Sequence, residues 1–250
     1  MSISKRTLSM AGALLLAATL APAGEAVVYK SGMAQVGGYL ATPTGKGPFP
    51  AVIVIQEWWG LNDWVKQQAD KLATQGYVAL APDLYRGKVA TTQEDAHQLM
   101  SGLPEDRAVG DLKAAWAFLN ARKDVNAARI GVVGWCMGGK YALRVAVEEP
   151  KLAAAVAYYG APPTDSTAIA RIKAPVLGNY GGDDKGPAPD DVRAFEAAMK
   201  KAGKSVDVKI YDGAPHAFAN ENNPWGGYRK EAAADAWART TAFFASHLKK

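Results

Sequence analysis

The hexapeptide Gly134-Trp135-Cys136-Met137-Gly138-Gly139 constrains this chain more than any other stretch. It lies between an apolar run at 130–133, which predicts a short buried strand, and residues 140–148, which predict a helix. A Gly-x-Cys-x-Gly turn between a strand and a helix is typical of a nucleophile elbow, with sulfur in place of a serine oxygen. Such a turn leaves no room for side chains at Gly134 and Gly138, and it lifts the cysteine clear of the sheet. Cys136 is therefore the candidate nucleophile.

A buried, inert cysteine on an ordinary glycine-rich turn is the competing interpretation. The strand–turn–helix context favours the nucleophile, and a helix N-terminus directly behind Cys136 favours a thiolate. The backbone N–H of Met137 is expected to point towards the atom under attack. Because the chain has a single cysteine, an internal disulfide and a multi-cysteine metal site are both excluded.

Strand and helix patterns alternate along the chain, which predicts an α/β fold with a mainly parallel sheet and helices on both faces. Strands are predicted at 33–41, 51–55, 77–81, 130–133, 153–159, 175–180 and 206–211. Helices are predicted at 62–75, 105–122, 140–148, 190–202 and 228–248, and residues 87–104 form a loosely helical polar region. We expect one domain over residues 24–250, with its site beyond the carboxyl ends of the strands.

The first 23 residues predict a secretory signal peptide, and hence a periplasmic or secreted protein. Lys5 and Arg6 precede a short apolar stretch at 11–20, and Ala21-Pro22-Ala23 is a cleavage pattern of small residues. A buried first helix or a membrane anchor is the alternative, and Sec and twin-arginine export both stay open. The net charge is +5 with scattered basic residues, which gives no nucleic-acid footprint.

Partners for Cys136 are found after later strands. His216, in the loop after the strand at 206–211, is the only one of the three histidines placed to reach the elbow. An imidazole needs a third group that holds its tautomer, and Asp184, after the preceding strand, is the candidate. Its neighbour Asp183 remains an alternative. The chain order Cys, Asp, His is the order of the α/β-hydrolase triad.

Five stretches together resemble the dienelactone hydrolase (carboxymethylenebutenolidase) family, over nearly all of the chain after the signal. They are Pro50-Ala51-Val52-Ile53-Val54-Ile55-Gln56-Glu57-Trp58-Trp59-Gly60, Ala81-Pro82-Asp83-Leu84-Tyr85, the elbow hexapeptide, Tyr180-Gly181-Gly182-Asp183-Asp184 and Ala214-Pro215-His216-Ala217-Phe218.

The resemblance implies an α/β-hydrolase fold with a Cys136–His216–Asp184 triad and no metal or organic cofactor. It implies an oxyanion hole made by the backbone N–H groups of Trp58 and Met137, which meet charge that develops only in the transition state. It also implies that Glu57 lies against the resting thiol and exchanges partners when substrate arrives. A satisfied polar residue at a strand end is the alternative for Glu57.

The sequence departs from the family where the substrate is held. Family members that act on dienelactone use arginines for its carboxylate, but the two corresponding positions are Asn220 and a position near Gln93. Arg86 or Arg107 are the available substitutes. The aromatic residues near the predicted strand ends, Trp58, Trp59, Tyr85 and Trp225, are expected to line an apolar or aromatic acyl pocket, with core packing as the alternative.

The sequence therefore predicts an exported, monomeric, cysteine-dependent hydrolase of a small ester or lactone, acting through an acyl thioester. It is expected to bind neither nucleic acid nor, after signal removal, a membrane. A non-hydrolytic binding or redox-sensing protein that uses the elbow cysteine is the alternative. A hydrolase of peptides or polymer esters is a further one, for which the sequence offers no gating domain.

Overall fold

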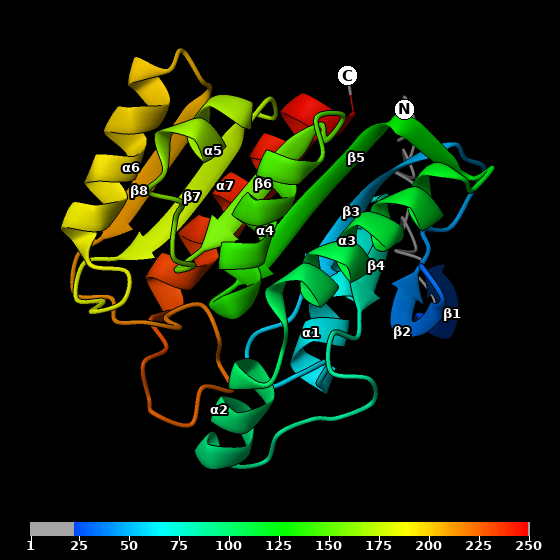
Figure 1. The fold of residues 1–250 in the computed structure, drawn as a ribbon, viewed down its shortest axis with the longest axis horizontal. Coiled ribbons are helices and arrows are strands. Elements are labelled where there is room, and N and C mark those ends of the chain that lie inside the picture. The colour runs from blue at the N-terminus through cyan, green and yellow to red at the C-terminus, as the bar shows by residue number, and fades with distance from the viewer. Residues whose placement is uncertain (1–22, 250) are drawn as a thin grey trace, which may run out of the picture.

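The computed structural model describes residues 23–249, so the predicted signal peptide lies, apart from Ala23, outside the described residues. Within this range a single sheet has the strand order β1-β2-β4-β3-β5-β6-β7-β8 (Figure 1). The strands are β1 (Glu25–Ser31), β2 (Ala34–Ala41), β3 (Phe49–Ile55), β4 (Val78–Pro82), β5 (Val125–Trp135), β6 (Ala154–Tyr158), β7 (Val176–Gly181) and β8 (Val206–Tyr211). The β1–β2 and β2–β4 pairs are antiparallel and all later pairs are parallel. The predicted α/β fold is thus confirmed.

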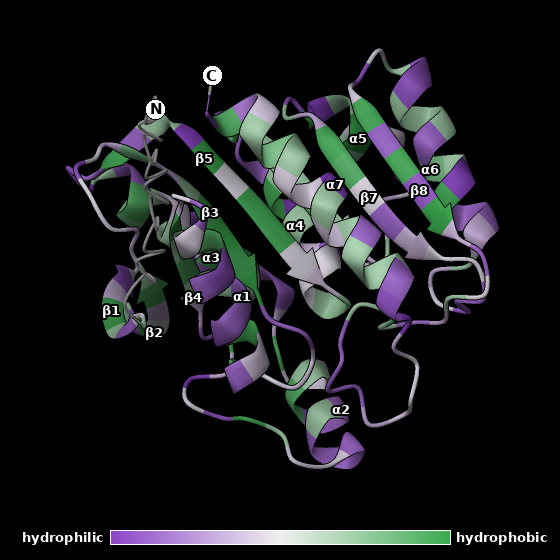
Figure 2. Ribbon diagram, turned by 180° about the vertical axis from the view of Figure 1, so that it is seen from behind, coloured by the Kyte–Doolittle hydropathy of each residue, from purple (hydrophilic) through white to green (hydrophobic). Residues whose placement is uncertain are grey.

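Helices cover both faces of the sheet (Figures 1 and 2). One face packs against α3 (Glu105–Asn120), α4 (Met137–Glu148), α5 (Ser166–Arg171) and α6 (Pro189–Lys201), and the other against α1 (Asp63–Thr74) and α7 (Lys230–Leu248). The remaining helix, α2 (Gln93–Ser101), lies beyond the carboxyl ends of the parallel strands, near the loop from β8 to α7. No helix in the described part of the chain is both long and apolar enough to span a membrane.

The central strands β3, β4, β6 and β7 and the second half of β5 are mostly apolar because both of their faces are covered. Every residue of β4, β6 and β7 is buried, as are the five residues Ala51–Ile55 of β3. Two separate apolar clusters result, one on each side of the sheet. Burial of this apolar surface is the main force that holds the strand ends, and hence the site, in place.

Two elements were not predicted from the sequence. The β1 strand lies at the sheet edge and buries only Tyr29, so its seven residues carry no clear apolar alternation. The α5 helix has six residues, too few for a helical period to show. It begins at a cap in which Asp165 accepts hydrogen bonds from the backbone N–H groups of Thr167 and Ala168. The last helix begins at Lys230 rather than at residue 228.

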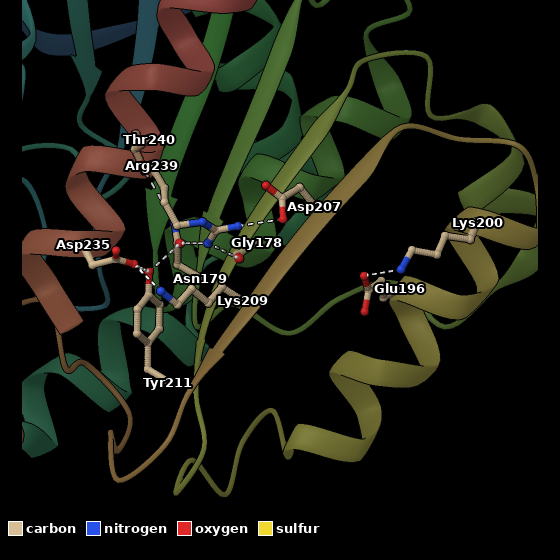
Figure 3. A network of polar contacts seen from close by, with 10 residues as sticks. All are labelled: Gly178, Asn179, Glu196, Lys200, Asp207, Lys209, Tyr211, Asp235, Arg239 and Thr240. Atoms are coloured by element: carbon tan, nitrogen blue, oxygen red, sulfur yellow. Dashed lines mark hydrogen bonds and ion pairs between the residues drawn. The ribbon is translucent and has the colours of Figure 1, made fainter.

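A polar network joins α7 to β7 and β8 (Figure 3). Arg239 on α7 donates to the buried Asn179 Oδ1 at 2.7 Å and to Asp207 Oδ1 at 2.8 Å. Asp235, one turn earlier, accepts from Tyr211 Oη at 2.8 Å and from Lys209 Nζ at 2.7 Å. These contacts fix the two strands whose following loops carry Asp184 and His216.

Candidate active site

Cys136 is the single residue between β5 and α4, and its backbone is strained. Its φ of 55° and ψ of −118° lie where residues with a side chain are rarely found. A Cβ on Gly134 would come within 2.1 Å of the Gly138 carbonyl oxygen, and a Cβ on Gly138 within 2.4 Å of the Ile55 oxygen. Only glycine fits at these two positions, so the sequence pattern has the steric cause proposed for it.

His216 is joined to Asp184. The Nδ1–H of His216 donates to Asp184 Oδ2 at 2.8 Å, and the other carboxylate oxygen accepts the Gly186 N–H at 2.9 Å. Asp184 is buried, whereas Asp183 is exposed on the same turn. Of the two acids that the sequence left open, the geometry brings Asp184 to the imidazole. With Nδ1 engaged in this way, Nε2 remains for the thiol.

The environment of His216 favours an imidazolium. Burial alone lowers the pKa of His216, but its hydrogen bonds with Asp184 and Cys136 and their negative charges outweigh burial and raise that pKa to about 10. The ring of Tyr159 packs edge-on against the imidazole, with the two centroids 5.1 Å apart. An imidazole next to a thiol can take the thiol proton, which is how a cysteine is activated as a nucleophile.

Two backbone N–H groups belong to residues that share cavities with Cys136. Trp58, just after β3, donates its N–H to no other group among residues 23–249. Met137 is the first residue of α4, so its N–H lies outside the helical hydrogen-bond ladder. Both residues line cavities that Cys136 also lines. These donors are the ones that the sequence resemblance assigned to an oxyanion hole.

Glu57 is a buried carboxyl group that lines the same cavity as Cys136, and its placement against the resting thiol stays a prediction. Its Oε2 accepts a hydrogen bond from Asn220 Nδ2 at 2.7 Å, and its Oε1 accepts one from Tyr159 Oη at 3.4 Å. The Asn220 amide is locked in this orientation because its Oδ1 accepts the Asn222 N–H at 2.8 Å. Burial raises the pKa of Glu57 to about 7, against the opposing effects of Asn220, His216 and Tyr159.

Two cavities meet at Cys136 and His216. The first, of about 300 Å³, is called here the tryptophan cavity; its walls include Trp58, Trp59, Trp225 and Met100. The second cavity, of about 310 Å³, is lined by Leu103, Met137, Tyr141 and Tyr159, with the ion pair of Lys140 and Glu105 beside them. A substrate whose carbonyl carbon lies at Cys136 therefore has room on both sides.

Three of the four predicted pocket aromatics line the tryptophan cavity, and Tyr85 does not. Tyr85 is buried, and its hydroxyl donates to Met137 Sδ at 3.2 Å. Its position after β4 brings it to the correct edge of the sheet, but the side chain points beneath the elbow helix. A sequence pattern predicts the edge of the sheet at which a residue lies, but not the direction of its side chain. For this reason the prediction that Tyr85 lines the pocket was wrong.

Neither arginine substitutes for a carboxylate anchor. Arg86 Nη2 lies 2.7 Å from Asp111 Oδ2, and Arg107 Nη1 lies 3.7 Å from the same atom. Arg107 also donates to the Leu84 carbonyl at 3.2 Å. Both guanidinium groups therefore support the buried Asp111 on α3. Gln93, at the start of α2, is exposed.

Sequence reasoning missed several residues around the nucleophile. Tyr159 contacts both His216 and Glu57, and it follows β6 at the same edge of the sheet, so the rule that located the other residues would have found it. Met100 and Lys140 line the cavities from α2 and α4. Met100 gave no signal, because a methionine in a polar helical region indicates no role.

Comparison with known proteins agrees with this geometry. Residues 36–248 match the dienelactone hydrolase family. A protein of Methylorubrum extorquens, provisionally named a carboxymethylenebutenolidase, is 37% identical over 220 residues, which cover 82% of this chain and 75% of the relative. Protein usf of Aquifex pyrophilus is 36% identical over 90% of this chain and 99% of its own length.

Solved structures agree as well. A crystal structure from Klebsiella pneumoniae, provisionally described as a dienelactone hydrolase, superposes with a TM-score of 0.81 at 30% identity, covering 89% of this chain and 98% of the other. A dienelactone hydrolase-like promiscuous phosphotriesterase from metagenomic libraries superposes with a TM-score of 0.82 at 27% identity, covering 90% and 98%. The sequence resemblance is confirmed: the chain belongs to the dienelactone hydrolase family and is a hydrolase.

Proposed function

We propose that the protein is a cysteine-dependent hydrolase of a small ester or lactone, which acts through an acyl thioester on Cys136. The observation that carries the proposal is the chain of contacts from Asp184 through His216 to the thiol at a strained elbow. The family membership supports hydrolysis, and the family name supports an ester or lactone as the bond that is cleaved.

In the first half-reaction, the Cys136 thiolate attacks the substrate carbonyl carbon and the carbonyl oxygen becomes an oxyanion. The backbone N–H groups of Trp58 and Met137 stabilise that charge. The tetrahedral intermediate then collapses, the carbon–oxygen bond to the leaving group breaks, and the His216 imidazolium gives its proton to the departing alkoxide. From an ester an alcohol leaves, whereas from a lactone the new hydroxyl stays attached to the acyl chain; in both cases the acyl group remains on sulfur with a neutral imidazole beside it.

In the second half-reaction, neutral His216 takes a proton from a water molecule as the water oxygen attacks the thioester carbonyl. The same two N–H groups stabilise the second oxyanion. Collapse breaks the carbon–sulfur bond, which releases the carboxylic acid and restores the thiolate next to the imidazolium. Asp184 holds the ring in the required tautomer and compensates its charge in both steps.

We also propose that the protein is exported and acts in the periplasm or outside the cell. The support is the pattern of the first 23 residues: a positive start, a short apolar stretch and small residues at a cleavage position. A single cysteine suits such a compartment when the thiol is half-buried and paired with a base, as Cys136 is.

Hydrolysis by the protein without residues 1–23 tests the catalytic proposal. Neutral lactones, dienelactone and short-chain ethyl esters are offered to the wild type, Cys136→Ala, His216→Ala and Asp184→Asn. Cys136→Ala is expected to lower kcat by about 1,000-fold or more, because the nucleophile is lost while binding is retained. Asp183→Asn is the matched control for Asp184→Asn, and it is expected to change kcat less than twofold because Asp183 is exposed.

Full activity of Cys136→Ala would overturn the thioester mechanism. If the folded wild type turns over none of these substrates but its thiol reacts with peroxide, the redox-sensing alternative is favoured instead.

A further inference from the structure

Three indole rings form one wall of the tryptophan cavity. Its three indole rings contact one another, with centroid separations of 5.2 Å for Trp58 and Trp59, 5.6 Å for Trp58 and Trp225, and 5.8 Å for Trp59 and Trp225. The interplanar angles of 64°, 50° and 37° show that the rings are tilted rather than stacked, so they form sides of a concave surface. Such a surface presents both ring faces and ring edges to a flat guest.

Trp225 differs from the other two rings. It lies on the loop between β8 and α7, the residue is 46% exposed, and its backbone N–H donates to Asn223 Oδ1. Large apolar side chains with this exposure are few in the described part of the chain, and this one faces the cavity that contains the nucleophile. Contact with a substrate would remove much of its remaining surface from water, which favours binding.

The charges around the cavity oppose an anionic guest. Among the described residues, no lysine or arginine lines the tryptophan cavity, and its acidic group is Glu57. Asn220 lines the cavity as well, but its amide is already committed to Glu57. Arg86 and Arg107 are held by Asp111. The one cationic group in the lining that the structure describes is His216, which Asp184 and Cys136 already engage, so a substrate carboxylate placed here would lose water without gaining a free cation.

We propose that the tryptophan cavity binds an uncharged aromatic ring of the ester or lactone substrate, with Trp225 as the residue that sets the preference. This inference rests on the proposed hydrolase function and names its substrate class. The reacting carbonyl then lies at Cys136, and the non-aromatic part of the substrate extends into the second cavity beside Lys140 and Glu105.

Two pairs of substrates that differ only in aromaticity test the proposal. Ethyl phenylacetate and ethyl cyclohexylacetate place the ring on the acyl side, and benzyl acetate and cyclohexylmethyl acetate place it on the alcohol side. For wild type, kcat/KM of the aromatic member of at least one pair is expected to exceed that of its partner by about threefold to tenfold, the usual size of an aromatic contact beyond its area. Trp225→Ala is expected to remove this ratio, and Trp225→Phe to keep most of it.

Tyr228→Ala is the matched control, because Tyr228 is an exposed aromatic residue on the same loop that lines a different cavity, between α1 and α7. It should leave the ratio unchanged. Ethyl 4-carboxyphenylacetate should be hydrolysed at least about tenfold less efficiently than ethyl phenylacetate, because its carboxylate would meet Glu57 in place of a cation.

An aromatic ratio near one in both pairs, or a ratio that survives Trp225→Ala, would overturn the inference. The proposed function is judged separately, by turnover of ethyl acetate. Turnover that depends on Cys136 without any aromatic preference refutes the cavity assignment and leaves the thioester mechanism standing. If the folded wild type hydrolyses none of these esters, neither ethyl acetate nor the aromatic ones, both proposals are refuted.

Discussion

At the scale of single residues, Glu57 is the carboxyl group whose burial costs the fold most clearly. Burial raises its pKa to about 7, while an unfolded glutamate titrates near 4.5. Between these two values the unfolded chain loses a proton that the folded protein keeps. The free energy of unfolding contributed by this residue therefore falls as the pH rises through this window, and the whole penalty is present above pH 7.

Glu57→Gln is predicted to stabilise the protein at pH 8, because glutamine carries no charge and its oxygen still accepts the Asn220 hydrogen bond. A shift of this size corresponds to up to about 3 kcal/mol at pH 8 and to almost nothing at pH 4.5. Urea unfolding at the two pH values measures the difference. Glu105→Gln serves as the control: its exposed carboxylate pairs with Lys140, which lowers its pKa, so no gain is expected. Equal stabilisation by Glu57→Gln at both pH values would show that charge burial is not the cause.

The same residue shows why a protein retains an unfavourable group. A buried carboxyl group beside a thiol and an imidazole is poised to exchange a proton at neutral pH, which a surface glutamate is not. The Asn220 amide, whose oxygen accepts the Asn222 N–H, fixes the position of one Glu57 carboxylate oxygen. Glu57 thus lowers the stability of the fold, as is expected of groups that a protein keeps for function.

At the scale of elements, β7, β8 and α7 form the unit that carries the acid and base. The buried side chain of Asn179 on β7 accepts a hydrogen bond from Arg239 on α7, and Arg239 also pairs with Asp207 on β8 (Figure 3). Asn179 is fully buried, so its oxygen is costly to leave without a strong donor. Without Arg239, the remaining donor is Tyr211 Oη at 3.4 Å.

Arg239→Ala is predicted to lower the free energy of unfolding by about 1–3 kcal/mol, the cost of leaving a buried polar group poorly paired. Arg193→Ala is the matched control. Arg193 forms an ion pair with one acid, Asp190, on the same helix α6. Both of these side chains are largely exposed, so a change below about 0.5 kcal/mol is expected. Urea unfolding with an unchanged m-value makes the comparison. Equal losses in the two variants would mean that the network contributes no more than a surface pair.

The sequence predicted some elements of the fold and missed others. Where both faces of a strand are covered, as in β4 and β6, the apolar run alone was sufficient, and the elbow was recognised because its glycines, cysteine and flanking elements are contiguous. The edge strand β1 was not predicted because an edge strand needs little apolar surface. The α5 helix was not predicted because its six residues make less than two turns.

At the scale of the whole molecule, the parallel sheet brings together residues that are far apart in the chain. The rule that sites lie beyond the carboxyl ends of strands placed Glu57, Cys136, Asp184 and His216 at one edge without any coordinates. Which way each side chain points from that edge depends on packing between distant segments. Sequence periodicity does not predict such packing. It therefore could not choose between Asp183 and Asp184, could not place the side chain of Tyr85 beneath the elbow helix, and could not show that Asp111 engages Arg86.

The whole molecule also explains why two cavities flank one nucleophile. The α2 helix and the loop from β8 to α7 come from opposite sides of the sheet and meet beyond its edge, where Met100 and Trp225 face the same space. The second cavity opens on the other side of Cys136, between α4 and the start of α3. The acyl thioester that we propose would be anchored at the junction, with one side left free for the departing alcohol and then for water.

The central claim is that one acyl thioester on Cys136 lies on the path from every ester to its acid. It is tested most directly by letting the acyl group partition between water and hydroxylamine, starting from esters of one acid with ethyl, trifluoroethyl and phenyl leaving groups. A common thioester predicts the same ratio of hydroxamate to acid from all three esters, and both products should be lost in Cys136→Ala. A ratio that changes with the leaving group would mean that water attacks each ester directly, and it would contradict the account.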